Sequence, residues 1–195
     1  MTTTMTAEEH KSRSDRSYKL LLLFAMISMI MMFAGLTSAF VVSKSRADWL
    51  KDFQLPTAFY FSTAVIIGCS VTFHLAKKAI QKDNQKATTS LLLATLALGI
   101  LFVILQFVGF SQIVANGYYF TGAESSITTT FLYIVTVVHL AHLSGGLIAL
   151  LVIIYKQLNH KYNSTQTLGI ELGAMYWHFL DLLWVYLFLF LFFFK

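Results

Sequence analysis

Long apolar runs dominate this chain, and short polar stretches separate them. A helix needs about 20 residues to cross the ~30 Å hydrocarbon core of a bilayer. Five runs reach that length, at residues 19–42, 57–76, 88–110, 127–155 and 171–194. The fourth run exceeds a straight crossing, so we expect it to tilt or to end in the interface. The pattern therefore predicts an all-α integral membrane bundle of five transmembrane helices.

The composition agrees with a membrane solvent. Hydrophobic residues make up 57% of the 195 positions and charged residues only 12%, too few charges to cover a soluble domain of this length. We expect one transmembrane domain over residues 19–195, preceded by a polar cytoplasmic tail over residues 1–18. The first apolar run is too long for a signal peptide and should remain as a membrane helix. Pro56 precedes the second run, and Cys69 is the single cysteine, so no disulfide can form within the chain.

Basic residues stand at the ends of the runs and predict the orientation. If the N-terminus is inside, the outer side holds four of them, Lys44, Arg46, Lys51 and Lys195. The inner side holds ten, Lys11, Arg13, Arg16, Lys19, Lys77, Lys78, Lys82, Lys86, Lys156 and Lys161. The positive-inside rule therefore predicts an inside N-terminus and an outside C-terminus. Topology explains the net charge of +5 better than nucleic-acid binding does.

Small residues recur every four positions in two runs. Ala141, Gly145 and Ala149 do so in the fourth run, and Gly35 and Ala39 in the first. Such stripes let helix backbones approach closely in lipid, so we expect them to be helix contacts. The loop at residues 157–167 is short and polar, and we expect no pocket for a soluble substrate there.

Ionisable side chains at membrane depth call for a functional hypothesis. Here they are His74, His139, His142, His178 and Asp181, with Glu171 at the inner edge. At ~1.5 Å per residue, His142 and Asp181 both lie roughly 15 Å from the inner boundary. His178 and Asp181 share one helix face, as do His139 and His142. We hypothesise a buried, hydrogen-bonded polar layer made of His139, His142, His178 and Asp181.

Three interpretations of these histidines compete. A haem held by two histidines needs ligands at matched depth, but His74 and His178 lie closer to the inner edge than His142. A transporter path needs continuous polar groups, but the outer halves of most runs are nearly free of them. We favour polar pairs that set the register of the helices. No phosphate-binding glycine motif and no hydrolase triad order is present.

The last run carries a specific motif. Its residues are Glu171, Tyr176, Trp177, His178, Phe179, Asp181 and Trp184. This run resembles the signature of subunit III of haem–copper oxidases, in which Tyr-Trp-His-Phe-(Val/Leu)-Asp precedes a tryptophan. Upstream, His139 and His142, followed by Gly146, are similar to the His-x-x-His-x-x-x-Gly stretch of that family. Leu105-Gln106, Leu55-Pro56 and Ile27-Ser28 also fall at the expected places, so the resemblance covers nearly the whole chain beyond the polar N-terminus.

The resemblance implies an accessory, non-catalytic subunit of a proton-pumping terminal oxidase that reduces oxygen to water. It implies haems and copper in subunits I and II, and no catalytic, cofactor-binding or metal-binding residue in this chain. It implies packing against subunit I, contact with subunit II, bound phospholipid, and support for stability and proton uptake. Membership of a respiratory supercomplex is compatible with it.

The electron donor and the location follow less directly. We favour cytochrome c as the donor and a bacterial inner membrane as the location. The alternatives are the same subunit of a quinol oxidase, a small multi-pass transporter and a membrane cytochrome. Whether the chain counts as an enzyme outside its complex stays open.

Two departures from the family pattern qualify the resemblance. Many members have seven helices, whereas this chain resembles a five-helix form that lacks the first two. Many members also carry a glutamate after Ile-Ser in the first shared helix, where this chain has Met29. Met29 lies at about the depth of His142, so a proton role that depends on that glutamate does not carry over. Glu171 matches an acidic position of the family, and the dipole of a helix start also favours it there.

Overall fold

The computed structural model describes residues 7–46, 49–50, 54–122, 126–164 and 166–194. Lys51, Lys195 and the first six residues of the predicted tail lie outside the described residues. The helices are α1 (Ala7–Val42), α2 (Thr57–Gln81), α3 (Gln85–Ala115), α4 (Ile127–Leu158) and α5 (Leu168–Phe194), with a short 3₁₀ helix η1 (Ser43–Ser45). In this described part, five helices are long and apolar enough to span a membrane. The predicted all-helical membrane fold is confirmed.

The helices extend beyond the apolar runs. The predicted starts at Thr57 and Ile127 agree with α2 and α4. Helix α1, however, begins at Ala7, inside the predicted polar tail, and α3 and α4 also run on into polar sequence. Lysine, arginine, glutamate and glutamine are good helix formers, so a helix need not end where its apolar stretch ends.

Local sequence explains where several helices begin. Pro56 occupies the N-cap of α2, next to positions whose N–H groups have no partner within the helix. The Asn84 side chain accepts a bond from the Ala87 N–H at the start of α3. Ser126 and Thr129 form a reciprocal capping box at the start of α4. These side chains satisfy backbone donors that the first turn leaves free.

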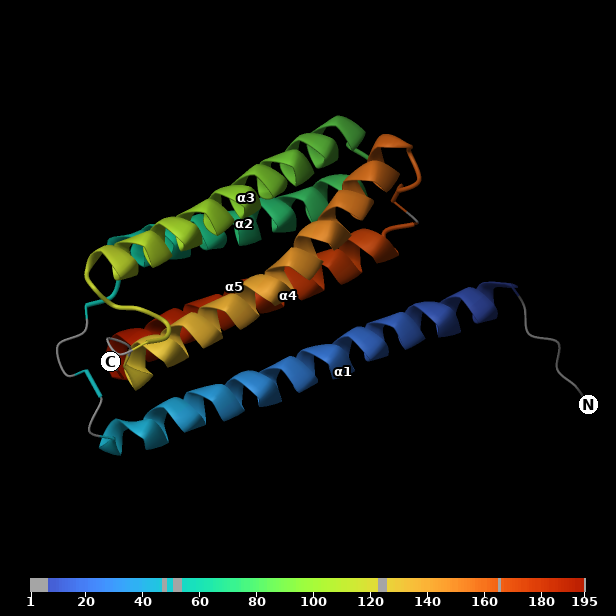
Figure 1. The fold of residues 1–195 in the computed structure, drawn as a ribbon. Helices are drawn as coiled ribbons and strands as arrows, with labels where there is room; N and C mark the ends of the chain where they lie inside the picture. Colours follow the sequence, from blue (N-terminus) through green and yellow to red (C-terminus); the bar gives the residue numbers. More distant parts are fainter. Residues whose placement is uncertain (1–6, 47–48, 51–53, 123–125, 165, 195) are drawn as a thin grey trace, which may run out of the picture.

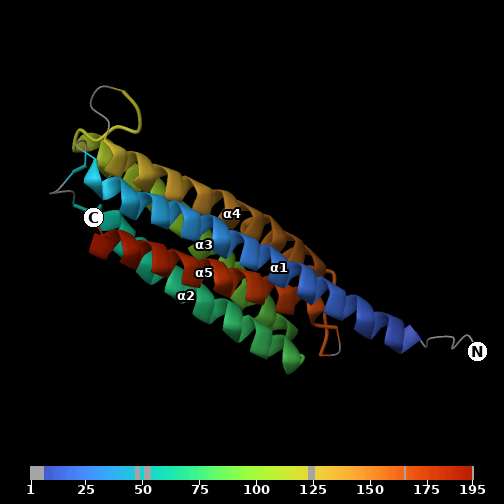
Figure 2. The ribbon, with the colours of Figure 1, turned by 90° about the horizontal axis from the view of Figure 1, so that it is seen from below.

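Helices α2 to α5 form a four-helix bundle, and α1 packs against one side of it (Figure 1). Helices α2 and α3 make the most extensive contact, and α5 contacts both α2 and α4. Figure 2 shows α1 lying along α4 and α5. The start of α1, the α2–α3 turn and the α4–α5 connection lie at one end, which we call the N-terminal end of the bundle.

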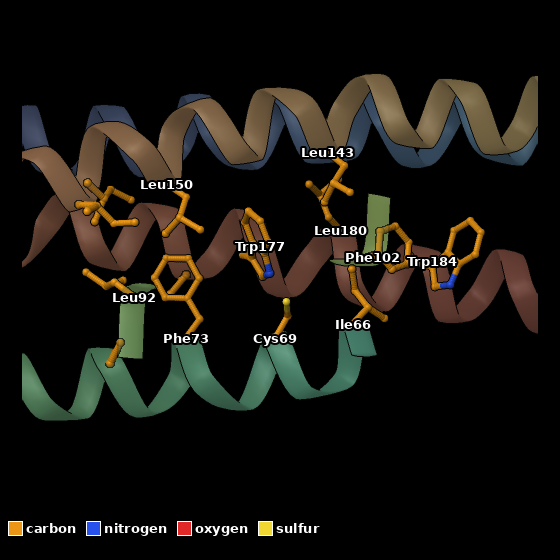
Figure 3. Packing of buried hydrophobic residues seen from close by; sticks show 14 of the residues in the cluster. Ile66, Cys69, Phe73, Leu92, Phe102, Leu143, Leu150, Trp177, Leu180 and Trp184 are labelled. Atoms are coloured by element: carbon orange, nitrogen blue, oxygen red, sulfur yellow. The ribbon is translucent and has the colours of Figure 1, made fainter. Parts of the chain in front are cut away.

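The core is built around two tryptophans of α5 (Figure 3). Trp177 and Trp184 are each 1% exposed. The Trp184 ring lies edge-on to Phe59 of α2 and Phe102 of α3, with ring centroids 5.7 and 5.2 Å away. Its Nε1 donates to Thr63 Oγ1 at 3.1 Å. This tryptophan therefore joins α5 to α2 and α3 by both packing and a hydrogen bond.

The predicted small-residue contacts are wrong within this chain. All five residues, Gly35, Ala39, Ala141, Gly145 and Ala149, are exposed on the surface of the bundle. A side chain added at Gly35 would meet nothing within 4 Å. Close approach occurs instead at Gly109, where an added Cβ would clash with Phe59 Cε1. A spacing of four is common to packed and lipid-facing stripes, so spacing alone does not distinguish them.

Candidate functional site

The polar residues at membrane depth form two separate groups. His139 and His142 lie on α4, and Phe33 of α1 packs near both rings. His178 and Asp181 lie on α5, where His178 contacts Ser70 of α2. No hydrogen bond joins any two of the four residues that the sequence grouped into one layer. The expected bonding within that layer is therefore not present in the described structure.

His139 is completely buried and surrounded by rings. Its exposed fraction is 0%, and neither ring nitrogen has a hydrogen-bond partner among the described residues. The rings of Trp184 and Phe102 lie 5.1 and 6.1 Å from the histidine ring, centroid to centroid. A polar ring in such a cluster loses its bonds to water without gaining others.

His142 has its side-chain hydrogen-bond partner within its own helix. It is half-buried, and its Nδ1 lies 2.7 Å from the Val138 carbonyl oxygen one turn earlier. No hydrogen bond joins His142 to Asp181, which was expected at the same depth. A histidine can instead bond the free lone pair of a nearby helix carbonyl. The His142 backbone oxygen in turn accepts from the Tyr176 hydroxyl at 3.0 Å. Met29 is half-buried on α1.

The contact between α2 and α5 holds the second group. Ser70 Oγ lies 2.6 Å from His178 Nδ1, and the His74 ring lies 6.1 Å from the His178 ring. Asp181 is 5% exposed, and neither carboxyl oxygen has a hydrogen-bond partner among the described residues. The carboxyl group lies close to Ser70 and acts electrostatically on Cys69, both on α2. The sequence did not reveal Ser70, because a serine in an apolar run looks like an ordinary helix residue.

Glu171 lies in the first turn of α5, as its position in the motif predicts. Its carboxylate accepts from Lys19 Nζ and from Thr167 Oγ1, both at 2.8 Å. Lys77 of α2 also acts electrostatically on this carboxylate. The Lys19–Glu171 pair joins α1 to α5, and the sequence did not reveal it because the pairing depends on which helices are neighbours.

A pocket opens at the N-terminal end, where we expected none. Its volume is about 600 Å³. It is lined by the start of α1, the end of α4 and the α4–α5 connection, with Lys11, Asp15, Lys19, Lys156, Lys161, Tyr162 and Glu171 among the lining residues. The expectation failed because it considered the 157–167 loop alone, whereas α1 extends past the membrane edge and forms one wall.

Side chains also tie the two turns at this end together. Asp83 accepts from the Ser164 N–H and from the Ser164 hydroxyl, both at 2.9 Å. Gln85 Nε2 donates to the Tyr162 carbonyl oxygen at 2.9 Å. These bonds hold the α2–α3 turn against the α4–α5 connection.

Replacing His139 with leucine should raise the free energy of unfolding by about 1 kcal/mol. The substitution removes buried nitrogens that have no partner, each of which costs about 1–3 kcal/mol, while losing some contact between rings. Reversible unfolding of the full chain in mixed micelles, followed by circular dichroism, measures the change. His142→Leu is the matched control, and it should not stabilise, since it removes the bond to Val138. A clear loss of stability in His139→Leu would contradict this account.

Among the described residues, no group of three or more histidine, cysteine, aspartate or glutamate side chains could hold a metal ion.

Comparisons with known proteins connect these features to a family. The family model for cytochrome c oxidase subunit III matches residues 2–195. Cytochrome c oxidase subunit 3 of Drosophila yakuba is 35% identical over 137 residues, which cover 70% of this chain and 49% of that protein. The subunit 3 sequence of Spodoptera frugiperda is 34% identical over 140 residues, with 70% and 87% covered. That of Damaliscus lunatus is 27% identical over 192 residues, with 92% and 70% covered. The chain thus spans about half the length of the Drosophila relatives that it matches.

Proposed function

Because the chain belongs to the cytochrome c oxidase subunit III family, we propose that it is an accessory subunit of a proton-pumping haem–copper oxidase. The observation that carries the proposal is the match over residues 2–195, which includes the Tyr176–Trp184 motif. In this role the chain is non-catalytic. The haems and copper reside in subunits I and II, and the chain packs mainly against subunit I.

The burial and contacts of the motif residues support a scaffolding role. Trp177 and Trp184 are buried in the core, and the Tyr176 hydroxyl donates to α4. These residues hold α5 against its neighbours. The five helices also expose many large apolar side chains, as expected of a chain that lies in lipid and beside other membrane subunits.

Phospholipid contact is part of the proposal. An apolar groove of about 430 Å³ lies between α1 and α5, lined by Ile30, Phe33, Ala34, Phe179, Leu182, Leu183 and Tyr186. The lysine-lined pocket lies along the same pair of helices, at their N-terminal end. An acyl chain fits the chemistry of the groove, and a phosphate group fits that of the pocket.

The charge distribution supports an inside N-terminus. The described basic residues from the start of α1, the end of α2 and the end of α4 belong to the N-terminal end of the bundle, which the positive-inside rule assigns to the cytoplasmic side.

We further propose cytochrome c rather than quinol as the donor, a bacterial inner membrane as the location, and compatibility with a supercomplex. These three points rest on the family resemblance.

Removing this chain should shorten the working life of the oxidase. Membranes from cells that lack the chain should begin oxygen consumption at a rate close to that of complemented cells, and then lose activity faster during turnover. The expectation follows because an accessory subunit stabilises the catalytic centre without holding it. An oxygen electrode with excess donor measures both the initial rate and the decay. Equal decay in the two preparations would contradict a stabilising role.

A further inference from the structure

The buried carboxyl group of Asp181 needs an explanation that packing does not supply. It lies ten residues beyond Glu171 along α5, about 15 Å deeper at the helical rise. Neither oxygen has a hydrogen-bond partner among the described residues. An ionised carboxylate without a partner is costly at this depth, so such a site favours the neutral acid. A neutral carboxyl group must obtain its proton from somewhere.

A series of polar side chains leads from Asp181 to the N-terminal end. His178 lies one turn before Asp181 on the same face of α5. Ser70 of α2 contacts His178 at 2.6 Å and also lies close to the Asp181 carboxyl group. The serine therefore lies close to both a titratable ring and a titratable carboxyl group, and its hydrogen bond goes to the ring.

The series continues towards the end of the bundle. His74 lies one turn from Ser70 on α2, with its ring 6.1 Å from the His178 ring. Lys77, the next residue on that face, acts electrostatically on both His178 and Glu171. Glu171 is bonded to Lys19 of α1. Polar groups of α2 and α5 thus follow one another along the contact between these helices as far as the N-terminal end. We call this contact the α2–α5 seam.

We propose that the α2–α5 seam is a proton path that connects the N-terminal end of the bundle with Asp181, a proton-exchange site. In the inner step, the Ser70 hydroxyl gives its proton to an Asp181 carboxylate oxygen and receives the proton of His178 Nδ1. A protonated His178 thereby becomes neutral, and the carboxylate becomes the acid. The neutral ring keeps its proton at Nε2. His178 is charged again when the ring turns and its Nδ1 takes up a proton from the side of His74 and the aqueous boundary. No electron is transferred, and the number of protons is the same before and after the step.

Other titratable groups face this region from the neighbouring helices. The Cys69 thiol, on α2, donates to the Thr95 carbonyl oxygen at 3.5 Å. On α4, His139 lies against Trp184. Lys19 is the α1 group at the seam's entrance. The path deepens the proposed support for proton uptake and to that extent rests on the proposed function, but the residues that form it belong to this chain alone.

Infrared spectroscopy of the full chain in lipid nanodiscs tests the proposal. The carboxylic acid band of Asp181 is identified by its loss in Asp181→Asn, and its rate of exchange is followed after transfer to D2O. Ser70→Ala and His178→Phe should each slow exchange about tenfold or more, since a positioned proton donor contributes ~10²–10⁴-fold to a rate. Ser70→Thr keeps the hydroxyl and should exchange at the original rate.

Ser144→Ala is the matched control, because that hydroxyl donates to the Leu140 carbonyl oxygen on α4, away from the seam. It should leave the exchange rate unchanged, and melting curves establish that all variants are folded. Unchanged exchange in folded Ser70→Ala and His178→Phe would overturn the path. An acid band that persists in Asp181→Asn would overturn the exchange site. The isolated chain suffices for the measurement, so this failure is distinct from a failure to find an oxidase partner.

Discussion

Replacing Trp184 with alanine is expected to lower the free energy of unfolding by about 3–5 kcal/mol. The indole is 1% exposed and packs against Phe59, Phe102 and His139, which come from three other helices. Its removal leaves a cavity and deprives Thr63 of the Nε1 bond. Helix association in lipid depends on packing more than on exclusion of water, so the lost contacts are felt directly.

Reversible unfolding of the full chain in mixed micelles, monitored by circular dichroism, measures this effect. Phe193→Ala is the control, because Phe193 is 71% exposed and its truncation should change stability by no more than about 0.5 kcal/mol. Equal stabilities of the two variants would mean that Trp184 is not central to the core. Trp184→Phe should retain most of the packing and lose mainly the hydrogen bond.

The second large effect is expected at Gly109. A methyl group at this position would clash with Phe59 Cε1, and the Phe59 ring itself packs against Trp184. Because neither helix can move without disturbing that cluster, Gly109→Ala should cost about 1–3 kcal/mol. The same unfolding measurement applies.

Gly35→Ala is the matched control for Gly109. It makes the same chemical change in a helix, at a position where an added Cβ meets nothing within 4 Å. It should leave stability unchanged or raise it slightly, since alanine is the better helix former. A Gly109→Ala variant as stable as Gly35→Ala would contradict the close approach of α2 and α3.

The sequence predicted the spanning helices well because their signal is strong. A stretch of about 20 apolar residues has few other interpretations. Three motif residues at helical spacing, Trp177, Asp181 and Trp184, are all buried. The predicted positions of the helix ends were less accurate, since α1 continues through polar residues back to Ala7. Those extra turns form one wall of the pocket that the loop sequence did not predict.

Partners across helices could not be predicted, because they depend on which helices are neighbours. Lys19 and Glu171 bond across α1 and α5, and Ser70 bonds His178 across α2 and α5. Depth alone suggested that His142 faces Asp181, but a nearby carbonyl of its own helix takes the ring nitrogen. The prediction of helix contacts at the small-residue stripes failed for the same reason, since spacing does not say which face of a helix meets another helix.

Purification of the tagged chain from its native membranes in mild detergent tests the central claim most directly. A reduced-minus-oxidised haem spectrum and identification of the co-purified chains complete the measurement. We predict that a large haem- and copper-binding subunit accompanies the chain, and that the haem signal is lost when the chain is separated from it. A chain recovered alone and colourless would contradict the account and favour a transporter. A haem retained by the separated chain would contradict it in favour of a membrane cytochrome.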